Sequence, residues 1–334
     1  MAAAIGWFLL GLVLLALGGD SIVKGAAGLG RRFGLAPFAV GLLLVAVATS
    51  LPELWVNVMA IATGQHSLAL GNAVGSNVVN IGLTLGAAAF VAPLLVRWRA
   101  LAPLLAVLIG GTIAVMVLGL DGVLSRVDGA ILVIAFVAVV AYALLRSRHE
   151  SAELQASIAE YTFTHDALGL NLVRVLVGAA LLTFGSGLIV GGLPFSLLGI
   201  DLSESHAAII GAGLGMTPLV TGLLPVAIAT ALPEAAAAIA AARRGQGDIV
   251  AGHVIGSSLV NLLLVVGGIA LVSPAHGLAV PESFLRLEWP AALVFALMLL
   301  PVLRGDLRVS RNEGIGLLVA LVAWIAFELV LLQR

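Results

Sequence analysis

Two stretches of this chain place polar groups inside hydrophobic segments. Residues 46–53 read AVATSLPE, and residues 227–234 read AIATALPE. Each stretch lies within an apolar run long enough to cross a bilayer, and each carries a hydroxyl, a proline and a carboxylate there. Because ionisable groups are costly at membrane depth, we expect both stretches to be functional.

The composition predicts an integral membrane protein. Hydrophobic residues make up 61% of the 334 residues and charged residues only 10%, whereas soluble domains contain about 25% charged residues. The absence of cysteine excludes disulfides and thiolate metal sites, and the net charge of −1 gives no sign of nucleic-acid binding. Gly211-x-Gly213-x-Gly215 lacks the context of a dinucleotide fingerprint. We therefore expect neither an enzyme nor a bound cofactor.

The hydropathy pattern predicts an all-α fold, because apolar runs of about 20 residues recur along the chain, whereas β-barrel strands would be short and alternating. The N-terminal run lacks a basic segment before it, so it is interpreted as the first span rather than a cleaved signal. We place ten spans at residues 4–29, 35–62, 68–92, 98–119, 127–146, 168–192, 206–242, 248–272, 288–303 and 312–332.

The spans divide into two predicted repeats of five. Residues 1–146 form the first repeat and residues 168–334 the second, and the polar residues 147–167 form a cytoplasmic linker. All but three of the sixteen Lys and Arg residues then fall on one side of the membrane, the exceptions being Arg126, Arg286 and Arg334. The positive-inside rule places both termini outside. Since five is odd, the repeats are inverted relative to one another.

An internal repeat in the sequence supports this division. At an offset of 181 residues, most of residues 33–53 are identical to the aligned residues of the second half. The same offset continues without a gap through residues 64–86. Upstream the offset becomes 167, which implies about fourteen extra residues near Pro194–Ala207.

The repeated polar residues predict a cation site. Pro52 and Pro233 lack an N–H, so each helix is expected to kink or break before Glu53 or Glu234 and to free backbone carbonyls. Thr49 shares a helical face with Glu53 and Thr230 with Glu234; Ser76 with Asn80 and Ser257 with Asn261 repeat the four-residue spacing. Hard cations such as Na⁺ and Ca²⁺ prefer such oxygen ligands.

Structural explanations compete for some of these residues. A single kinked Thr-x-x-Pro-Glu could be purely structural, but two copies favour function. Ser50 and Asn77 are weaker candidates because Ala231 and Ser258 replace them in the second copy. Asn57 is interpreted as an interhelical hydrogen bonder. His253, which replaces Asn72, is interpreted as an interfacial residue, with a proton-sensitive group as the alternative.

The segments 48–53 and 71–80, with their copies at 229–234 and 252–261, resemble the α repeats of the cation/calcium antiporters, in the sodium/calcium exchanger branch. The resemblance implies Ca²⁺ transport against Na⁺ by alternating access, with Na⁺ and Ca²⁺ as substrates, the lipid bilayer as surroundings and no obligate protein partner. It implies central Ca²⁺ ligands at Glu53 and Glu234. The further ligands that it implies are Thr49, Thr230, Ser50, Ser76, Ser257, Asn80, Asn261, Ala46 and Ala227.

Two departures from the family pattern leave the coupling ion open. Ala231 stands where the family usually has serine, which removes a hydroxyl from a Na⁺ site, and Asn261 stands where some members carry aspartate. Sodium/calcium exchange is the leading hypothesis. The alternatives are H⁺-coupled exchange of Ca²⁺ or another divalent cation and, in a different class, a passive channel or cation sensor. We expect the protein in a prokaryotic cell membrane.

Overall fold

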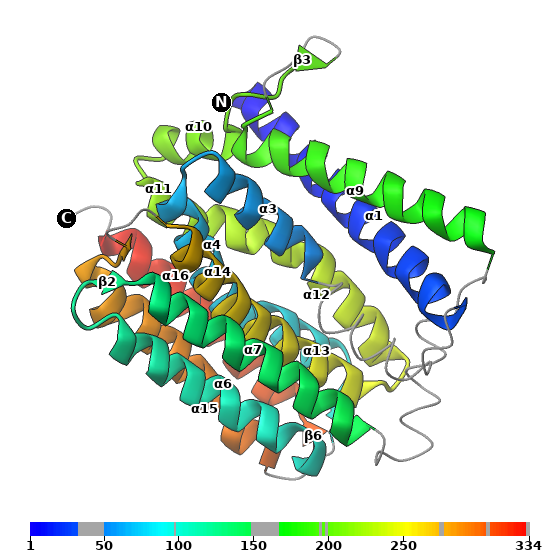
Figure 1. The fold of residues 1–334 in the computed structure, drawn as a ribbon. Coiled ribbons are helices and arrows are strands. Elements are labelled where there is room, and N and C mark those ends of the chain that lie inside the picture. Colours follow the sequence, from blue (N-terminus) through cyan, green and yellow to red (C-terminus); the bar gives the residue numbers. More distant parts are fainter. Residues whose placement is uncertain are drawn as a thin grey trace. The chain divides into compact units, whose positions relative to one another are not determined.

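The computed structural model of the chain is almost entirely helical (Figure 1). It describes residues 1–32, 50–96, 98–147, 167–193, 196–197, 200–273, 277–304 and 308–331. Within these residues, nine helical segments are long and apolar enough to cross a membrane, and α3 (Leu51–Ala62) is a shorter apolar helix. The all-α membrane fold predicted from the sequence is confirmed. Of the predicted span 35–62, only residues 50–62 are described.

The helices follow the predicted spans closely. The first half contains α1 (Ala2–Arg32), α3, α4 (His66–Val79), the π-helix η2 (Asn80–Leu85), α5 (Gly86–Val91), α6 (Trp98–Leu118) and α7 (Arg126–Ser147). The second half contains α9 (Leu168–Val190), α10 (His206–Gly213), α11 (Pro218–Thr221), η3 (Gly222–Val226), α12 (Ala227–Arg243), α13 (Gly247–Leu259), η4 (Val260–Val265), α14 (Val266–Val272), η5 (Phe284–Glu288), α15 (Trp289–Arg304) and α16 (Arg311–Leu331).

The chain folds into two compact units, each built from both halves of the sequence. The first unit contains residues 1–63 and 137–210, and the second contains residues 64–136 and 211–334. The division into sequence halves stays a prediction. Most of the predicted linker 147–167 lies outside the described residues.

In the first unit, α1 packs along α9, as Figure 1 shows. A methyl group on Gly11 would lie 2.8 Å from the Gly185 carbonyl oxygen, and one on Gly18 would lie 2.9 Å from the Gly178 oxygen. The two contacts are equivalent in the repeat, because the offset of 167 residues aligns Gly11 with Gly178 and Gly18 with Gly185. The α1–α9 interface is therefore pseudo-symmetric.

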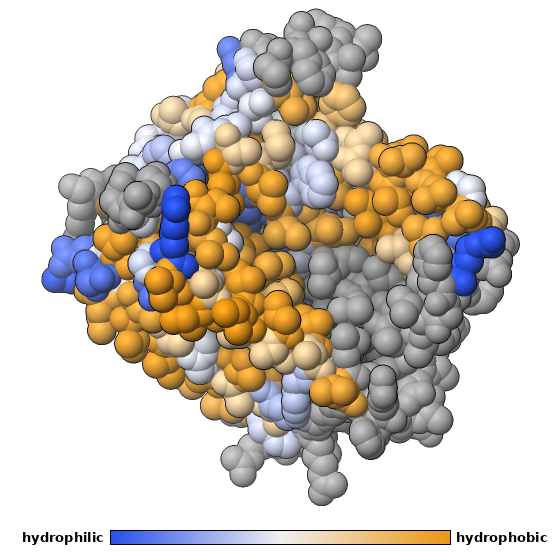
Figure 2. Space-filling model, in the orientation of Figure 1, coloured by the Kyte–Doolittle hydropathy of each residue, from blue (hydrophilic) through white to orange (hydrophobic). Residues whose placement is uncertain are grey.

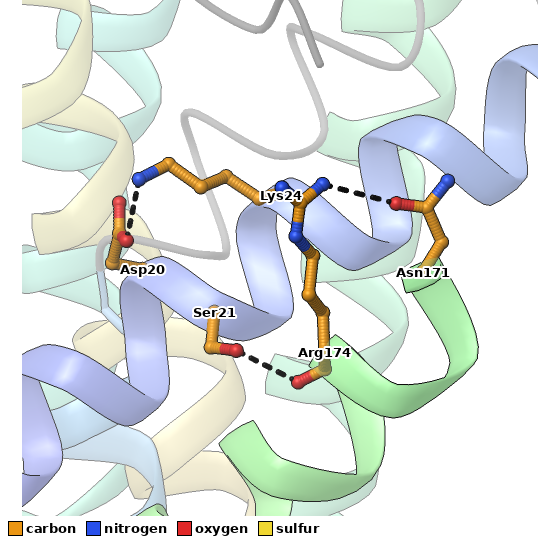
Figure 3. A network of polar contacts seen from close by, with 5 residues as sticks. All are labelled: Asp20, Ser21, Lys24, Asn171 and Arg174. Atoms are coloured by element: carbon orange, nitrogen blue, oxygen red, sulfur yellow. Dashed lines mark hydrogen bonds and ion pairs between the residues drawn. The ribbon is translucent and has the colours of Figure 1, made fainter. Parts of the chain in front are cut away.

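Polar contacts join the end of α1 to the start of α9 (Figure 3). The Ser21 hydroxyl donates to the Arg174 carbonyl oxygen at 2.9 Å, and the Arg174 guanidinium donates to Asn171 Oδ1 at 3.2 Å. Lys24 forms a 2.7 Å ion pair with Asp20, and both side chains are more than half exposed. The charged ends of these long side chains thus reach solvent beside an apolar helix.

The second unit repeats its own local structure at the predicted offset. Gly64 and Gly245 both have φ of +74°. The next residues, Gln65 and Gln246, precede α4 and α13 with nearly equal angles (φ −86°, ψ 51° and φ −89°, ψ 51°). A left-handed backbone at both positions explains the paired glycines, because other residues adopt it at a cost. The sequence repeat is therefore a structural repeat.

Matching caps and strand pairs extend this repeat. At the start of α7, the Ser125 hydroxyl and N–H both donate to Asp128, and at the start of α16 the same groups of Ser310 donate to Glu313. These are capping boxes, which satisfy the first N–H groups of a helix. Strand β1 (Leu94–Leu95) pairs with β6 (Arg308–Val309), and β2 (Val123–Leu124) pairs with β5 (Leu278–Ala279), both antiparallel.

The outward faces of the helices are apolar. On α7, Val127, Ile131 and Ile134 are at least half exposed, and α16 exposes Val319, Val322 and Phe327. Figure 2 shows apolar residues over most of the described surface in that view. Such a surface suits lipid rather than water, as the integral membrane assignment requires.

Three sequence-based expectations need correction or refinement. The predicted span 206–242 is interrupted at residues 214–217, between α10 and α11. The helix α12 continues through Pro233, so of the kink or break expected before Glu234 the break is wrong; a π-helical turn lies earlier, in η3, which contains Pro225. The insertion predicted near residues 194–207 contains a small hairpin of β3 (Ser196–Leu197) and β4 (Ile200–Asp201).

Candidate ion-binding site

The carboxylate of Glu234 is the centre of a buried polar cluster in the second unit. Glu234 lies two turns into α12, which packs against α4, η2 and α13. Glu234 is only 3% exposed, and the hydroxyl oxygen of Ser257 on α13 lies 3.5 Å from its Oε1 atom. A hydroxyl oxygen and a carboxylate oxygen thus lie side by side within the protein.

Asn80 connects this cluster to the first half of the sequence. Its amide Nδ2 donates to Ser257 Oγ at 2.9 Å, and both residues are fully buried. Asn80 Oδ1 has no hydrogen-bond partner within the described part of the chain. An oxygen buried in this way is available to a ligand, because burying it unpaired otherwise costs about 1–3 kcal/mol.

The two aligned asparagines both lie in π-helices. Asn80 is the first residue of η2, and Asn261 is the second residue of η4. A π-helical turn shifts the rotation of the residues that follow it, and such turns are frequent at functional sites. The hydropathy pattern contains no signal for these turns, so the sequence predicted only ordinary helix here.

His253 is the site residue that the sequence analysis placed wrongly. It is only 4% exposed, and its Nε2 lies 3.6 Å from Glu234 Oε2, so it is a buried residue of the cluster rather than an interfacial one. Its spacing of four residues from Ser257 was the available signal. The aligned Asn72 instead accepts a 3.5 Å hydrogen bond from the Ser76 hydroxyl.

The backbone of α12 offers further oxygen atoms. The Thr230 hydroxyl donates to the carbonyl oxygens of Val226 (3.0 Å) and Ala227 (3.3 Å), so its proton is used within its own helix. Since Pro233 lacks an N–H, the Ala229 carbonyl has no helical donor four residues later. Ala227 is fully buried.

In the first unit, α3 holds the other predicted carboxylate. Ser50 is its N-cap residue, Pro52 lies in its first turn, where a missing N–H costs nothing, and Glu53 follows. Ser50, Glu53 and Asn57 are fully buried. Thr49 and Ala46 lie outside the described residues.

The predicted site residues of the second unit are therefore joined by direct contacts, whereas those of the first unit are described as buried residues of α3 and its N-cap. In the second unit, Glu234, Ser257, Asn80 and His253 form one connected cluster. Ser76 on α4 and Asn261 on η4 are also fully buried, and these segments directly precede η2 and follow α13. With one imidazole among carboxylate, hydroxyl and amide oxygens, the donor set fits a hard cation.

Comparisons with known proteins agree with this chemistry. The family described as sodium/calcium exchanger protein matches residues 3–145 and 184–330. The putative antiporter CaxA of Alkalimonas amylolytica is 32% identical, and the match covers 97% of this chain and 98% of that protein. The sodium/calcium exchanger MaX1 of Methanosarcina acetivorans is 29% identical, with coverage of 95% and 96%.

A solved structure extends the similarity to three dimensions. The sodium–calcium exchanger NCX_Mj is 28% identical to this chain, and the two match with a TM-score of 0.62 over 97% of this chain and 98% of that one. The resemblance noted in the α repeats is thus confirmed over nearly the whole length. The chain belongs to the sodium/calcium exchanger protein family, a family of membrane transporters.

Proposed function

We propose that this protein exchanges Na⁺ for Ca²⁺ across a prokaryotic cell membrane by alternating access, with both termini outside. The observation that carries the proposal is the buried carboxylate of Glu234 beside Ser257, Asn80 and His253, repeated in sequence around Glu53. A buried carboxylate without a counter-charge is unfavourable. Bound cations therefore stabilise the occluded protein, and an empty site resists reorientation, which is the condition for exchange rather than leak.

The proposed ligands fall into three groups by chemistry. The carboxylates of Glu53 and Glu234 bind Ca²⁺, with the carbonyl oxygens of Thr49 and Thr230. Asn80 and Asn261 line the pocket. The flanking Na⁺ ligands are Ala46, Thr49, Ser50, Ser76, Ala227, Thr230 and Ser257. The names of MaX1 and NCX_Mj, which are both sodium/calcium exchangers, support Na⁺ and Ca²⁺ as the exchanged ions.

Proton coupling is the second candidate function, and His253 favours it. Its imidazole lies 3.6 Å from the Glu234 carboxylate, and histidine is the side chain that most readily changes charge near neutral pH. Ala231 favours it as well, because a hydroxyl that could hold Na⁺ is absent there.

Calcium uptake into proteoliposomes distinguishes the two couplings. With pH clamped equally on both sides, an outward Na⁺ gradient is expected to drive ⁴⁵Ca²⁺ accumulation, and an equal K⁺ gradient is not. Uptake that follows a pH gradient and ignores Na⁺ would support the H⁺-coupled exchanger instead. Trans-acceleration by unlabelled Ca²⁺ tests the third class, because a passive channel shows none.

Restoring the missing hydroxyl is expected to strengthen Na⁺ binding. Ala231 is fully buried and aligns with Ser50. In Ala231→Ser, the Na⁺ concentration for half-maximal Ca²⁺ exchange should fall roughly fivefold, because one added polar contact contributes about 1 kcal/mol. Ala235→Ser, which adds the same hydroxyl one turn further along α12, is the matched control. Equal Na⁺ dependence in both variants would contradict a Na⁺ site at residue 231.

A further inference from the structure

Two glutamates outside the proposed ligand set are buried in membrane-spanning helices. Glu288 is the last residue of η5, and Glu328 lies near the end of α16. Each residue is only 4% exposed. Buried ionisable groups within spans are rare and usually functional, and neither residue has a role in the exchange chemistry proposed above.

The packing around Gly82 places these two glutamates at the same level along the axes of α15 and α16. A methyl group on Gly82 would lie 2.8 Å from Leu321 Cβ and 3.1 Å from Phe295 Cε1, so α16 and α15 both contact η2 at this level. Glu328 follows Leu321 by seven residues, and Glu288 precedes Phe295 by seven. Seven residues are two helical turns, which preserves the face. Because consecutive spans joined by a short connection are antiparallel, both glutamates lie in the same direction from Gly82.

The heptad face of α16 confirms that Glu328 points inward. The buried residues of this helix are Gly314, Leu317, Leu321, Trp324 and Glu328, which follow a spacing of three and four. Leu317 and Leu321 on this face contact Gly86 and Gly82. Glu328 therefore extends the contact face of α16.

The surroundings of the pair contain donors and apolar rings. The Trp324 indole, 7% exposed and one turn before Glu328, makes no hydrogen bond of regular geometry within the described residues. The same is true there of Glu288 Oε2 and Glu328 Oε1. Trp289 packs edge-on against Phe284, with ring centroids 5.9 Å apart.

No basic residue on the described elements that pack most extensively against α15 and α16 is positioned to neutralise the pair. Arg286 is close in sequence, but it is 74% exposed and pairs with the exposed Glu282 at 2.5 Å. The elements packed on α15 and α16 are α4, α5, α6, η2, η5 and β6. On these elements and on the two helices themselves, the remaining ionisable residues lie near helix starts or at the opposite ends of the spans: His66, Arg99, Arg304, Arg308, Arg311 and Glu313.

We propose that Glu288 and Glu328 form a protonation site outside the proposed ligand set. Two buried like charges without a counter-ion are unfavourable, so at least one of the two carboxyls keeps its proton. A metal ion fits poorly, because Ca²⁺ takes six to eight oxygen ligands, whereas the neighbours here include indole N–H donors.

Infrared spectroscopy directly tests whether Glu288 or Glu328 keeps a proton. In a protein carrying Glu53→Gln and Glu234→Gln, which removes both pocket carboxyls, a C=O stretching band of a protonated carboxylic acid is expected at about pH 6, where exposed carboxylates are already ionised. The band should disappear when Glu288→Gln or Glu328→Gln is added. Absence of the band from the double-Gln background would overturn the proposal without any need for the further variants to fold.

Thermal unfolding in detergent gives an independent readout. The folded pair holds a proton that the unfolded chain releases, so the unfolding temperature should fall as pH rises above the ordinary glutamate pKa of about 4.3. Glu288→Gln and Glu328→Gln should each flatten this slope by removing the repulsion. Glu282→Gln, an exposed carboxyl on the same connection, should keep the wild-type slope. One identical slope for the wild type and all three variants would refute the site.

Discussion

Ca²⁺ transport is expected to be abolished in Glu234→Gln, with a loss of at least about 100-fold in the initial rate of uptake. Glutamine keeps the volume and one oxygen of the side chain but removes the charge. Taking one partner from a buried charge pair costs about 3–5 kcal/mol, and Ca²⁺ in this pocket depends on carboxylate charge to offset its dehydration. Glu53→Gln is expected to lose transport to the same extent, because the repeat gives it the equivalent position.

The measurement is ⁴⁵Ca²⁺ uptake into proteoliposomes, normalised to the amount of reconstituted protein. Glu282→Gln is the matched control, since its carboxylate is 71% exposed and forms only a surface ion pair. Monodisperse elution in detergent shows that the variants are folded. Substantial uptake by either folded pocket variant would contradict a central role for that carboxylate.

The second large effect is expected at Gly75, where α4 crosses η3. A methyl group on Gly75 would lie 2.2 Å from the Leu223 carbonyl oxygen, and one on Gly222 would lie 2.1 Å from the Leu68 oxygen. These atoms belong to the backbone and cannot move aside without separating the helices. Alanine normally stabilises a helix interior by up to about 1 kcal/mol over glycine, but overpacking costs about 1–3 kcal/mol or more. We expect Gly75→Ala to be destabilising overall.

Gly268→Ala provides the matched control for this prediction. Gly268 lies in α14, and a methyl group there would have no atom within 4 Å in the described structure. The same substitution then gives the helical gain without the clash, so the unfolding temperature should stay constant or rise. In Gly75→Ala it should fall by several degrees, and Ca²⁺ uptake should fall because Ser76 and Asn80 lie on the same segment. Equal unfolding temperatures for the two variants would show that the α4–η3 contact yields easily.

The sequence predicted the repeat more completely than the helix geometry within it. The offset of 181 residues aligned Gly64 with Gly245 and Asn80 with Asn261, and the structure gives each pair the same backbone state. Proline chemistry was a weaker guide. It predicted a kink or a break before Glu234, yet α12 continues through Pro233 without a break, and a π-helical turn forms at η3 instead. The reason is that neighbouring helices and side chains can satisfy the backbone groups that a proline frees, which a local rule does not include.

By itself, the sequence determined the membrane fold, the two repeats and the residues available to bind cations, because hydropathy, identity at a fixed offset and residue chemistry are properties of the chain alone. The tertiary structure decided which of those residues meet. It placed His253 beside Glu234, linked Asn80 to Ser257, and brought Glu288 to the level of Glu328. Such contacts depend on the rotation and height of each helix against its neighbours. These are fixed by close packing at positions such as Gly75 and Gly82, and no local pattern encodes them.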